Sequence, residues 1–297
     1  MSKLLAGRVV IITGAGKGLG RVYAEYMAAE GAAIIVNNRR HPGQEDRNTS
    51  AFQVAEAIRR SGGSARENFD AVECPESGAR MVQQALEHFG RLDAVIANAA
   101  IPQASTFSKT TLADYRMIVE VGFFGALHLV HAAWPIFQQN NYGRIITTTS
   151  SAGRYGNHGL AAYSAAKAAV EMLTRSLAAE GQNHGIKVNA ISPYAYSQMT
   201  QDYLTPEIAS LFRPEHVAPM VAWLASEHCL ANGEVIVAGG GRFRRAYSVE
   251  TSSVGEKDMA ASYRLMREEL ASAHPSSNAA FASLVREVTA AKAEEGN

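Results

Sequence analysis

Residues 8–20 read RVVIITGAGKGLG, an apolar run that leads directly into a glycine-rich segment. The β-branched run favours a buried strand, and the residues that follow, GLGRVYAEYMAAEG, have the periodicity of a helix. Gly14, Gly18 and Gly20 allow a tight turn and a close approach of the backbone to a ligand. A strand, a glycine turn and a helix in this order can hold the pyrophosphate of a dinucleotide at the helix N-terminus. The alternative is a structural turn that binds nothing.

Short strands and longer helices alternate along the rest of the chain. Further runs with strand character are AAIIVNN, SARENFD, LDAVIAN, GRIITTT, IKVNAIS and EVIVAG, and most are separated by helical patterns. About seven strands with helical connections predict an α/β fold of Rossmann type, a doubly wound parallel sheet with helices on both faces. Ligands of such sheets bind beyond the carboxyl ends of the strands.

The pattern changes after GGGRFRRAY, and we expect a dinucleotide-binding domain over residues 1–247 and a C-terminal helical extension over residues 248–297. Residues 248–255 are rich in Ser, Thr and Gly, as linkers are. Two amphipathic helices follow, and their apolar stripes predict packing on the core or on a subunit interface, with a lid over a ligand as the alternative. The stripes consist of Met259, Tyr263, Met266 and Leu270 in the first helix and Phe281, Leu284, Val285 and Val288 in the second.

The composition excludes several classes of protein. Of 297 residues, 47% are hydrophobic and 19% charged, and the formal net charge is +0, so no basic surface for nucleic acid is expected. The apolar runs are much shorter than the roughly 20 residues of a membrane helix, and MSKLLAGRVV has no signal-peptide core. We therefore expect no membrane span and a cytoplasmic location. Cys74 and Cys229 lie in no ligand spacing, so neither a disulfide framework nor a metal site is expected.

The second strand ends in NNRR, where a dinucleotide-binding protein reads the adenosine ribose. A carboxylate there would accept hydrogen bonds from a 2′-hydroxyl group and repel a 2′-phosphate. Asn38 and Arg39 instead tolerate or bind a phosphate, and Lys17 adds a second cation in the glycine loop. We expect NADP(H) as the preferred cofactor. NAD(H) is the alternative, in which these charges are solvated loop residues.

Residues 147–167, TTTSSAGRYGNHGLAAYSAAK, carry the candidate catalytic groups. Tyr163 and Lys167 are four residues apart, so they lie on one face of the predicted helix. A lysine ammonium and the positive nicotinamide of an oxidised cofactor would lower the tyrosine pKa from its usual value of about 10 and make the phenol useful as an acid and base. Ser150, after the fifth strand, is suited to bind a carbonyl oxygen that gains charge as hydride arrives. Alone, a tyrosine and a lysine at this spacing would be a common surface pair.

Together, five segments resemble the short-chain dehydrogenase/reductase family over about residues 5–245: TGAGKGLG, IANAA at 96–100, Ser150, YSAAK at 163–167 and VNAISP at 188–193. The resemblance implies that Tyr163 is the general acid and base, that Lys167 also binds the nicotinamide ribose, and that Ser150 orients the substrate. Other segments, such as AAWP at 132–135 and RPEHVAPMVAWL at 213–224, resemble the branch of that family formed by (3R)-hydroxyacyl-CoA and 17β-hydroxysteroid dehydrogenases.

The family resemblance also implies contacts with the cofactor and with a second subunit. Asp70 and Ala71 would meet the adenine, and Asn98 with its alanine neighbours would stabilise the cofactor cleft. Helices with the small and apolar sequences ALHLVHAAWPIF and AAKAAVEMLTRSLA would pair across a two-fold axis in a homodimer or homotetramer. The candidate cofactor-binding residues are Gly14, Lys17, Gly18, Leu19, Gly20, Asn38, Arg39, Asp70, Ala71, Asn98, Ala99, Ala100, Tyr163, Lys167 and Pro193.

Three residues depart from the family pattern. Gly122 stands where many members have an asparagine that holds a relay water, so a backbone carbonyl or another side chain must hold that water, or activity is low. Tyr194 follows Pro193 in place of the usual glycine and would shape the substrate cleft near the nicotinamide. Asn38 replaces the aspartate that selects NAD in the hydroxyacyl-CoA branch.

The sequence as a whole predicts an oxidoreductase that interconverts a ketone and a secondary alcohol on a mostly apolar small molecule. The main hypothesis is that the protein reduces the ketone with NADPH. An NAD-dependent (3R)-hydroxyacyl-CoA or hydroxysteroid dehydrogenase is the alternative within the family. A catalytically weak nucleotide-binding sensor or scaffold is the alternative of another class, suggested by Gly122. The retention of Ser150, Tyr163 and Lys167 argues against that last alternative.

Overall fold

A computed structural model describes residues 3–196, 205–254, 258–267, 269–275 and 277–295. The chain divides into two compact units, Met1–Arg245 and Ala246–Asn297. The division falls close to the end of the predicted dinucleotide-binding domain. Each unit is described by itself.

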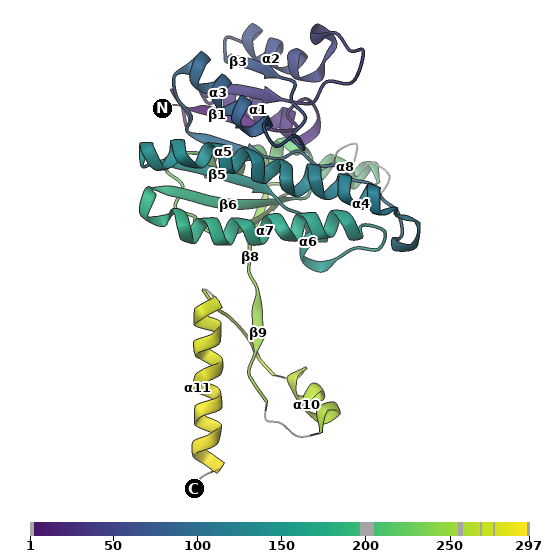
Figure 1. Ribbon diagram of the computed structural model, residues 1–297, viewed down its shortest axis with the longest axis vertical. Coiled ribbons are helices and arrows are strands. Elements are labelled where there is room, and N and C mark those ends of the chain that lie inside the picture. The colour runs from purple at the N-terminus through teal and green to yellow at the C-terminus, as the bar shows by residue number, and fades with distance from the viewer. Residues whose placement is uncertain (1–2, 197–204, 255–257, 268, 276, 296–297) are drawn as a thin grey trace. The chain divides into compact units, whose positions relative to one another are not determined.

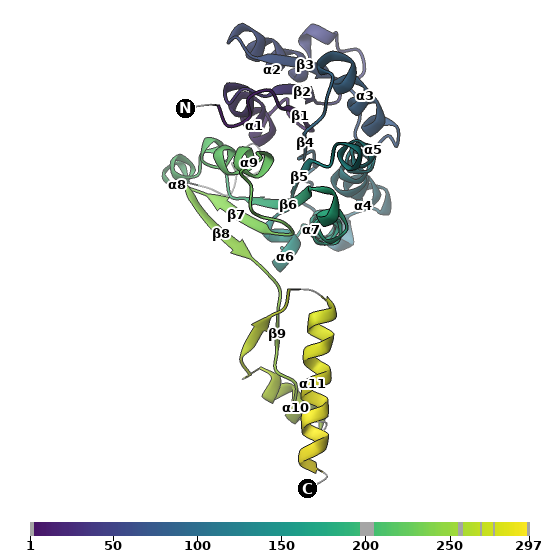
Figure 2. The ribbon, with the colours of Figure 1, turned by 90° about the vertical axis from the view of Figure 1, so that its left-hand side faces the viewer.

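The first unit, drawn in Figure 1, is built on one sheet. Its strand order is β3-β2-β1-β4-β5-β6-β7-β8, which Figure 2 labels in full. The neighbours from β3 to β7 pair in parallel, with β1 between β2 and β4. This order confirms the predicted Rossmann-type, doubly wound sheet. The strands are β1 (Val9–Ile12), β2 (Ala33–Asn37), β3 (Ser64–Asn68), β4 (Ala94–Ala97), β5 (Gly143–Thr148), β6 (Ile186–Pro193), β7 (Val235–Gly239) and β8 (Arg242–Ala246).

The edge strand β8 was not predicted. Its sequence RFRRA is mostly exposed and shows no apolar alternation, so it carries no strand signal. Gly240 and Gly241, with φ of +56° and +70°, turn the chain back beside β7. Both glycines have left-handed backbone conformations that other residues rarely adopt. The strand therefore depends on its turn rather than on its own pattern.

Helices cover both faces of the sheet (Figure 2). One face carries α1 (Gly18–Ala29), α2 (Ser50–Arg60) and α9 (Ala218–Ala225), and the other carries α3 (Ser77–Phe89), α5 (Gly125–Asn140) and α7 (Ala161–Gly181). Strand β1 shows how the two cores are divided, because Val10 and Ile12 pack in the first and Val9 and Ile11 in the second. A parallel strand buried on both faces reads as a continuous apolar run, which explains RVVIIT.

Shorter helical segments connect these elements. One of them begins directly after Ser150, which is its N-cap. The short helices are α4 (Leu112–Val119), α6 (Ser151–Tyr155) and α8 (Pro206–Leu211), with a π-helix at Glu120–Phe124 and 3-10 turns at Asp46–Asn48, Phe107–Lys109, Gln182–His184 and Pro214–His216.

The segments α4, the π-helix and α5 form one continuous helical stretch, Leu112–Asn140. Among the described residues, it is the stretch long and apolar enough to cross a membrane by length and composition, with a mean hydropathy of 1.4 and 44% of the window buried. Its α5 part packs on α3 and its α4 part on α7. A helix in a protein core has the same composition, so the stretch gives little support to a membrane span.

The second unit contains α10 (Met259–Met266), α11 (Ser277–Glu295) and a pair of antiparallel strands, β9 (Val249–Thr251) and β10 (Ala271–Ala273). The strands were not predicted, since three residues are too few to show a period. Leu270 lies outside α10, so the first apolar stripe is shorter than predicted. The stripe of α11 is half exposed or more at Phe281 and close to half exposed at Leu284, Val285 and Val288. Its packing on a core or a subunit interface stays a prediction.

Candidate active site

The glycine loop between β1 and α1 is shaped by the absence of side chains. Gly14 and Gly18 have φ of +64° and +51°, which favours glycine. A Cβ on Gly20 would lie 2.3 Å from the Gly14 carbonyl oxygen, so no other residue fits there without moving the backbone. Lys17 caps α1 with its side chain exposed, and Leu19 packs partly buried against the core. Such a cradle fits the pyrophosphate of a dinucleotide.

Asn98 joins the glycine loop to the end of β4. Its Nδ2 donates to the Thr13 carbonyl oxygen at 3.0 Å, and its backbone N–H donates to Thr13 Oγ1 at 3.0 Å. The Ala99 N–H donates to the same hydroxyl at 3.1 Å, and Ala100 is half-buried beside it. Thr13 was missed as a site residue, although it is the first letter of TGAGKGLG. Its hydroxyl joins the segment after β1 to the segment after β4.

The predicted adenine contact is held by a polar network at the ends of β2 and β3. Asn37 Nδ2 donates to Asn68 Oδ1 at 2.8 Å and to the Asp70 carbonyl oxygen at 2.9 Å. The Asp70 carboxylate accepts from Arg80 Nε at 2.7 Å and from Asn68 Nδ2 at 3.0 Å. Ala71, the next residue, is half-buried. The network holds this segment in place at the ends of β2 and β3, and its contact with adenine stays a prediction.

At the predicted ribose site, the structure adds a negative charge, Glu73, to the positive charges that the sequence predicted. Asn38 is half-buried, and Arg39 Nη1 lies 3.4 Å from Glu73 Oε1. Lys17 has no ion pair among the residues that the structure describes. Glu73 was not predicted, because it follows the third strand and only the fold brings it to the end of β2.

The three candidate catalytic residues come together beyond the end of β5. Ser150 Oγ accepts a hydrogen bond from the Ala152 N–H at 3.2 Å and is also hydrogen-bonded to the Tyr163 side chain. Lys167 Nζ donates to the Thr148 carbonyl oxygen at 2.6 Å and lies 5.7 Å from the centre of the Tyr163 ring. The lysine is only 2% exposed. A phenol, a hydroxyl and a buried ammonium therefore share one small site.

Burial dominates the electrostatics of this site. It raises the pKa of the Tyr163 phenol, while the hydrogen bond with Ser150 acts in the opposite direction. Burial also lowers the pKa of the Lys167 ammonium to about 8. The expected lowering of the tyrosine pKa is therefore not a property of the protein alone. The positive charge of an oxidised nicotinamide beside the phenol would act in the lowering direction.

Gly122 lies in the π-helix Glu120–Phe124, where the long helical stretch passes α7. A Cβ at Gly122 would be 3.2 Å from the Cβ of Ala166, the neighbour of Lys167 in sequence. This spacing is tight, so a larger residue would push against the helix that carries the catalytic pair. π-Helical turns are frequent at functional sites and change the hydrogen bonding of backbone carbonyls.

Pro193 ends β6 opposite Ala238, and the Tyr194 N–H donates to the Ala238 carbonyl oxygen at 2.7 Å. Residues 197–204, shortly after Tyr194, lie outside the described residues. Large apolar side chains are exposed on the segments that follow β4, β5 and β6. They are Phe107, Leu112, Tyr155, Tyr194, Tyr196, Ile208 and Leu211.

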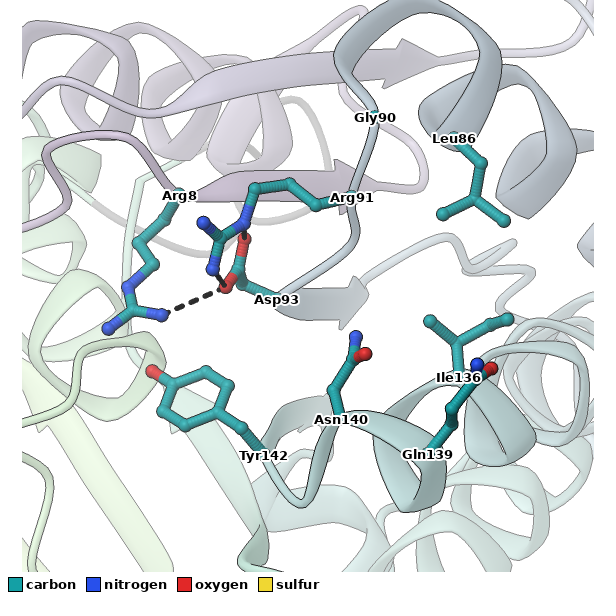
Figure 3. A pocket seen from close by; sticks show the side chains of 9 residues that line it. All are labelled: Arg8, Leu86, Gly90, Arg91, Asp93, Ile136, Gln139, Asn140 and Tyr142. Atoms are coloured by element: carbon teal, nitrogen blue, oxygen red, sulfur yellow. Dashed lines mark hydrogen bonds and ion pairs between the residues drawn. The ribbon is translucent and has the colours of Figure 1, made fainter.

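A hollow of about 590 Å³ lies at the amino ends of the strands (Figure 3), whereas the candidate active site lies at their carboxyl ends. Arg8, Asp93 and Tyr142 line the hollow, and they precede β1, β4 and β5 at the amino ends of these strands. Arg8 and Arg91 are both paired with the buried Asp93 carboxylate. This hollow is thus separate from the candidate active site. The described residues form no group of three or more His, Cys, Asp or Glu side chains that could hold a metal ion.

A dinucleotide cradle beside a tyrosine, a buried lysine and a serine defines a nicotinamide-dependent oxidoreductase that acts on alcohol and carbonyl groups. Residues 8–207 match the short chain dehydrogenase family. The chain belongs to this family of short-chain dehydrogenases/reductases, as its motifs predicted.

Relatives and solved structures agree with this membership. The chain is 40% identical to a short-chain type dehydrogenase/reductase of Mycobacterium tuberculosis over 80% of its own length and 84% of the relative. It is 42% identical to mouse peroxisomal multifunctional enzyme type 2 over 79% of its own length, but spans only 32% of that protein. The crystal structure of a short chain dehydrogenase from Mycobacterium avium has a TM-score of 0.80 at 30% identity, covering 92% of this chain and 98% of that one.

The buried Lys167 generates the first prediction. Its lowered pKa means that burial disfavours the charged form, so at pH 7 the folded state carries a penalty that unfolding relieves. We expect Lys167→Met to increase the free energy of unfolding at pH 7 by about 1–3 kcal/mol, after allowing for the donor lost to Thr148. Because the wild-type penalty fades as pH rises from about 8 toward 10.5, the difference between the proteins should shrink over that range.

Urea unfolding of both proteins at pH 7 and at higher pH measures this effect. Lys109→Met, at an exposed position, is the control and should change the free energy of unfolding by less than about 0.5 kcal/mol. A less stable Lys167→Met protein at pH 7 would contradict the prediction.

Proposed function

We propose that this protein reduces ketones to secondary alcohols with NADPH and that its substrates have a mostly apolar body. The observation that carries the proposal is the arrangement of Ser150, Tyr163 and Lys167 at the carboxyl end of the sheet, beside the glycine loop. The exposed apolar side chains after β4, β5 and β6 support an apolar substrate.

The residues of the chain divide the work of the reaction. Reduced nicotinamide, when bound, supplies a hydride to the carbonyl carbon. Tyr163 donates its phenolic proton to the carbonyl oxygen, and Ser150, which is hydrogen-bonded to Tyr163, donates a hydrogen bond to the same oxygen as its charge grows. Lys167 holds the ribose, and its ammonium stabilises the phenolate that remains.

The alternative is an NAD-dependent (3R)-hydroxyacyl-CoA or hydroxysteroid dehydrogenase. It is favoured by the similarity to mouse peroxisomal multifunctional enzyme type 2 and by the Glu73 carboxylate beside Arg39. A sensor or scaffold has no need of a buried lysine at a cost in stability, so the geometry argues against that reading.

Loss of the phenolic proton tests the chemistry. We expect Tyr163→Phe to reduce turnover by about 10²–10⁴-fold, because the mutant lacks the general acid. Its affinity for NADPH, measured by the fluorescence of the bound cofactor, should stay within about 3-fold of wild type. Steady-state kinetics with ketones, oxosteroids and β-ketoacyl thioesters gives the turnover. A mutant with near-normal turnover would show that another group supplies the proton.

Cofactor preference is the next prediction. Lys17 and Arg39 would bind a 2′-phosphate, and no carboxylate stands at position 38 to repel it. We expect wild type to favour NADPH over NADH by about 10–100-fold in kcat/KM, a ratio of the size given by one charge-assisted hydrogen bond. The double variant Asn38→Asp, Arg39→Leu should shift the preference toward NADH. If wild type prefers NADH at equal concentration, the NAD-dependent alternative becomes the better description.

Assembly into a homodimer or homotetramer is also part of the proposal. Met172 is exposed on α7, which contains the predicted interface sequence AAKAAVEMLTRSLA. Met117 and Phe124 are exposed on α4 and the π-helix, the first part of the continuous helical stretch whose α5 part contains the other predicted sequence, ALHLVHAAWPIF. We expect light scattering at micromolar concentration to give the mass of two or four chains. Met172→Glu should lower that mass, since it would place a charge in a packed interface. A monomeric wild-type protein would refute this part.

A further inference from the structure

We propose that Glu73 is a specificity-determining residue that restrains Arg39 and so weakens the preference for NADP(H) over NAD(H). The inference rests on the proposed function, because it concerns the cofactor site of the same reaction. It starts from an ion pair that joins two loops at the adenosine end of the site. Arg39 Nη1 lies 3.4 Å from Glu73 Oε1, with Arg39 45% and Glu73 30% exposed.

Each carboxylate oxygen of Glu73 has a different environment. Oε1 faces Arg39, whereas Oε2 is buried and has no hydrogen-bond partner. Arg39 is also the only cation paired with Glu73 among the described residues. The arginine therefore compensates a carboxylate that water reaches poorly. If Arg39 turned to a 2′-phosphate, it would leave that charge unpaired, which is unfavourable for a partly buried carboxylate.

The other cations of the loop lead to the same conclusion. Arg40 is paired with Asp46 at 2.6 Å, so it too is compensated within the loop. Lys17 has no carboxylate partner in the described part of the chain. Lys17 is therefore the cation free to meet a 2′-phosphate, while Arg39 contributes only to the extent that Glu73 releases it. The Glu73 carboxylate also repels the phosphate directly, as a negative charge at the end of β2 would.

Glu73 does not lie where the acidic residue that disfavours a 2′-phosphate usually lies. That residue usually stands at the end of the second strand. Asn38 occupies that place here, and Glu73 comes from the segment after β3. The carboxylate thus reaches the ribose end from a neighbouring loop and acts mainly through Arg39.

The test is a double-mutant cycle on cofactor binding, which needs no turnover. Dissociation constants for NADPH and NADH are measured by fluorescence titration for wild type, Glu73→Gln, Arg39→Leu and the double variant. We expect Glu73→Gln to tighten NADPH about 3–10-fold and to change NADH less than about 2-fold, because only NADPH presents a phosphate to the released arginine. In the Arg39→Leu background, most of this gain should disappear.

Glu25→Gln is the matched control. It removes a carboxylate from the exposed Arg21–Glu25 ion pair within α1 and should leave the NADPH to NADH ratio within about 2-fold of wild type. Equal changes for NADPH and NADH in Glu73→Gln would overturn the proposal, since they would show a merely structural role. A gain that persists fully in Arg39→Leu would overturn the part played by Arg39.

Failure of the proposed function gives different results. If wild type reduces no ketone, or prefers NADH, the proposed function is wrong as stated. The effect of Glu73→Gln on the ratio of the two dissociation constants still decides the role of Glu73. The inference fails when that ratio does not move toward NADPH, or when the gain persists fully in the Arg39→Leu background.

Discussion

The close contact between Gly14 and Gly20 is the constraint on which the candidate site depends. With the Gly14 carbonyl oxygen only 2.3 Å from where a Cβ of Gly20 would be, α1 must start directly beside the end of β1. Asn98 and Thr13 then tie the end of β4 to this turn, so the segments that follow β1 and β4 are fixed relative to each other. The remaining site residues lie at the same carboxyl-end side of the sheet, after other strands: Asn38 after β2, Asp70 after β3 and Ser150 after β5.

The sequence alone predicted the parallel sheet and the glycine turn after its first strand. Both could be predicted because buried strands and glycine turns have strong local signals. The sequence did not predict β8, whose exposed arginines show no alternation, or α6, whose five residues are too few to show a helical period. Glu73 and Thr13 show another limit. Their roles depend on contacts between segments far apart in sequence, which no single-segment pattern contains.

The catalytic pair illustrates how function and stability oppose each other here. Lys167 is almost completely buried and has one backbone acceptor, the Thr148 carbonyl, whereas an exposed lysine would be solvated by water. The sequence predicted its closeness to Tyr163 but not this burial, since spacing on a helix says nothing about what covers it. The buried ammonium of Lys167 lowers the stability of the folded state. Functional sites often keep such unfavourable groups because the activity needs them.

The π-helix at Glu120–Phe124 has a consequence for the helices on either side of it. A π turn accommodates one more residue than an α turn, and one residue corresponds to a rotation of about 100° around the helix axis. The apolar stripe of α4 is therefore out of phase with that of α5. One continuous helix can thus turn its first part toward α7 and its second part toward α3, although these two neighbours lie in different directions. The extra residue rotates the apolar side of the helix, so that one helix can pack on α7 at its start and on α3 further along.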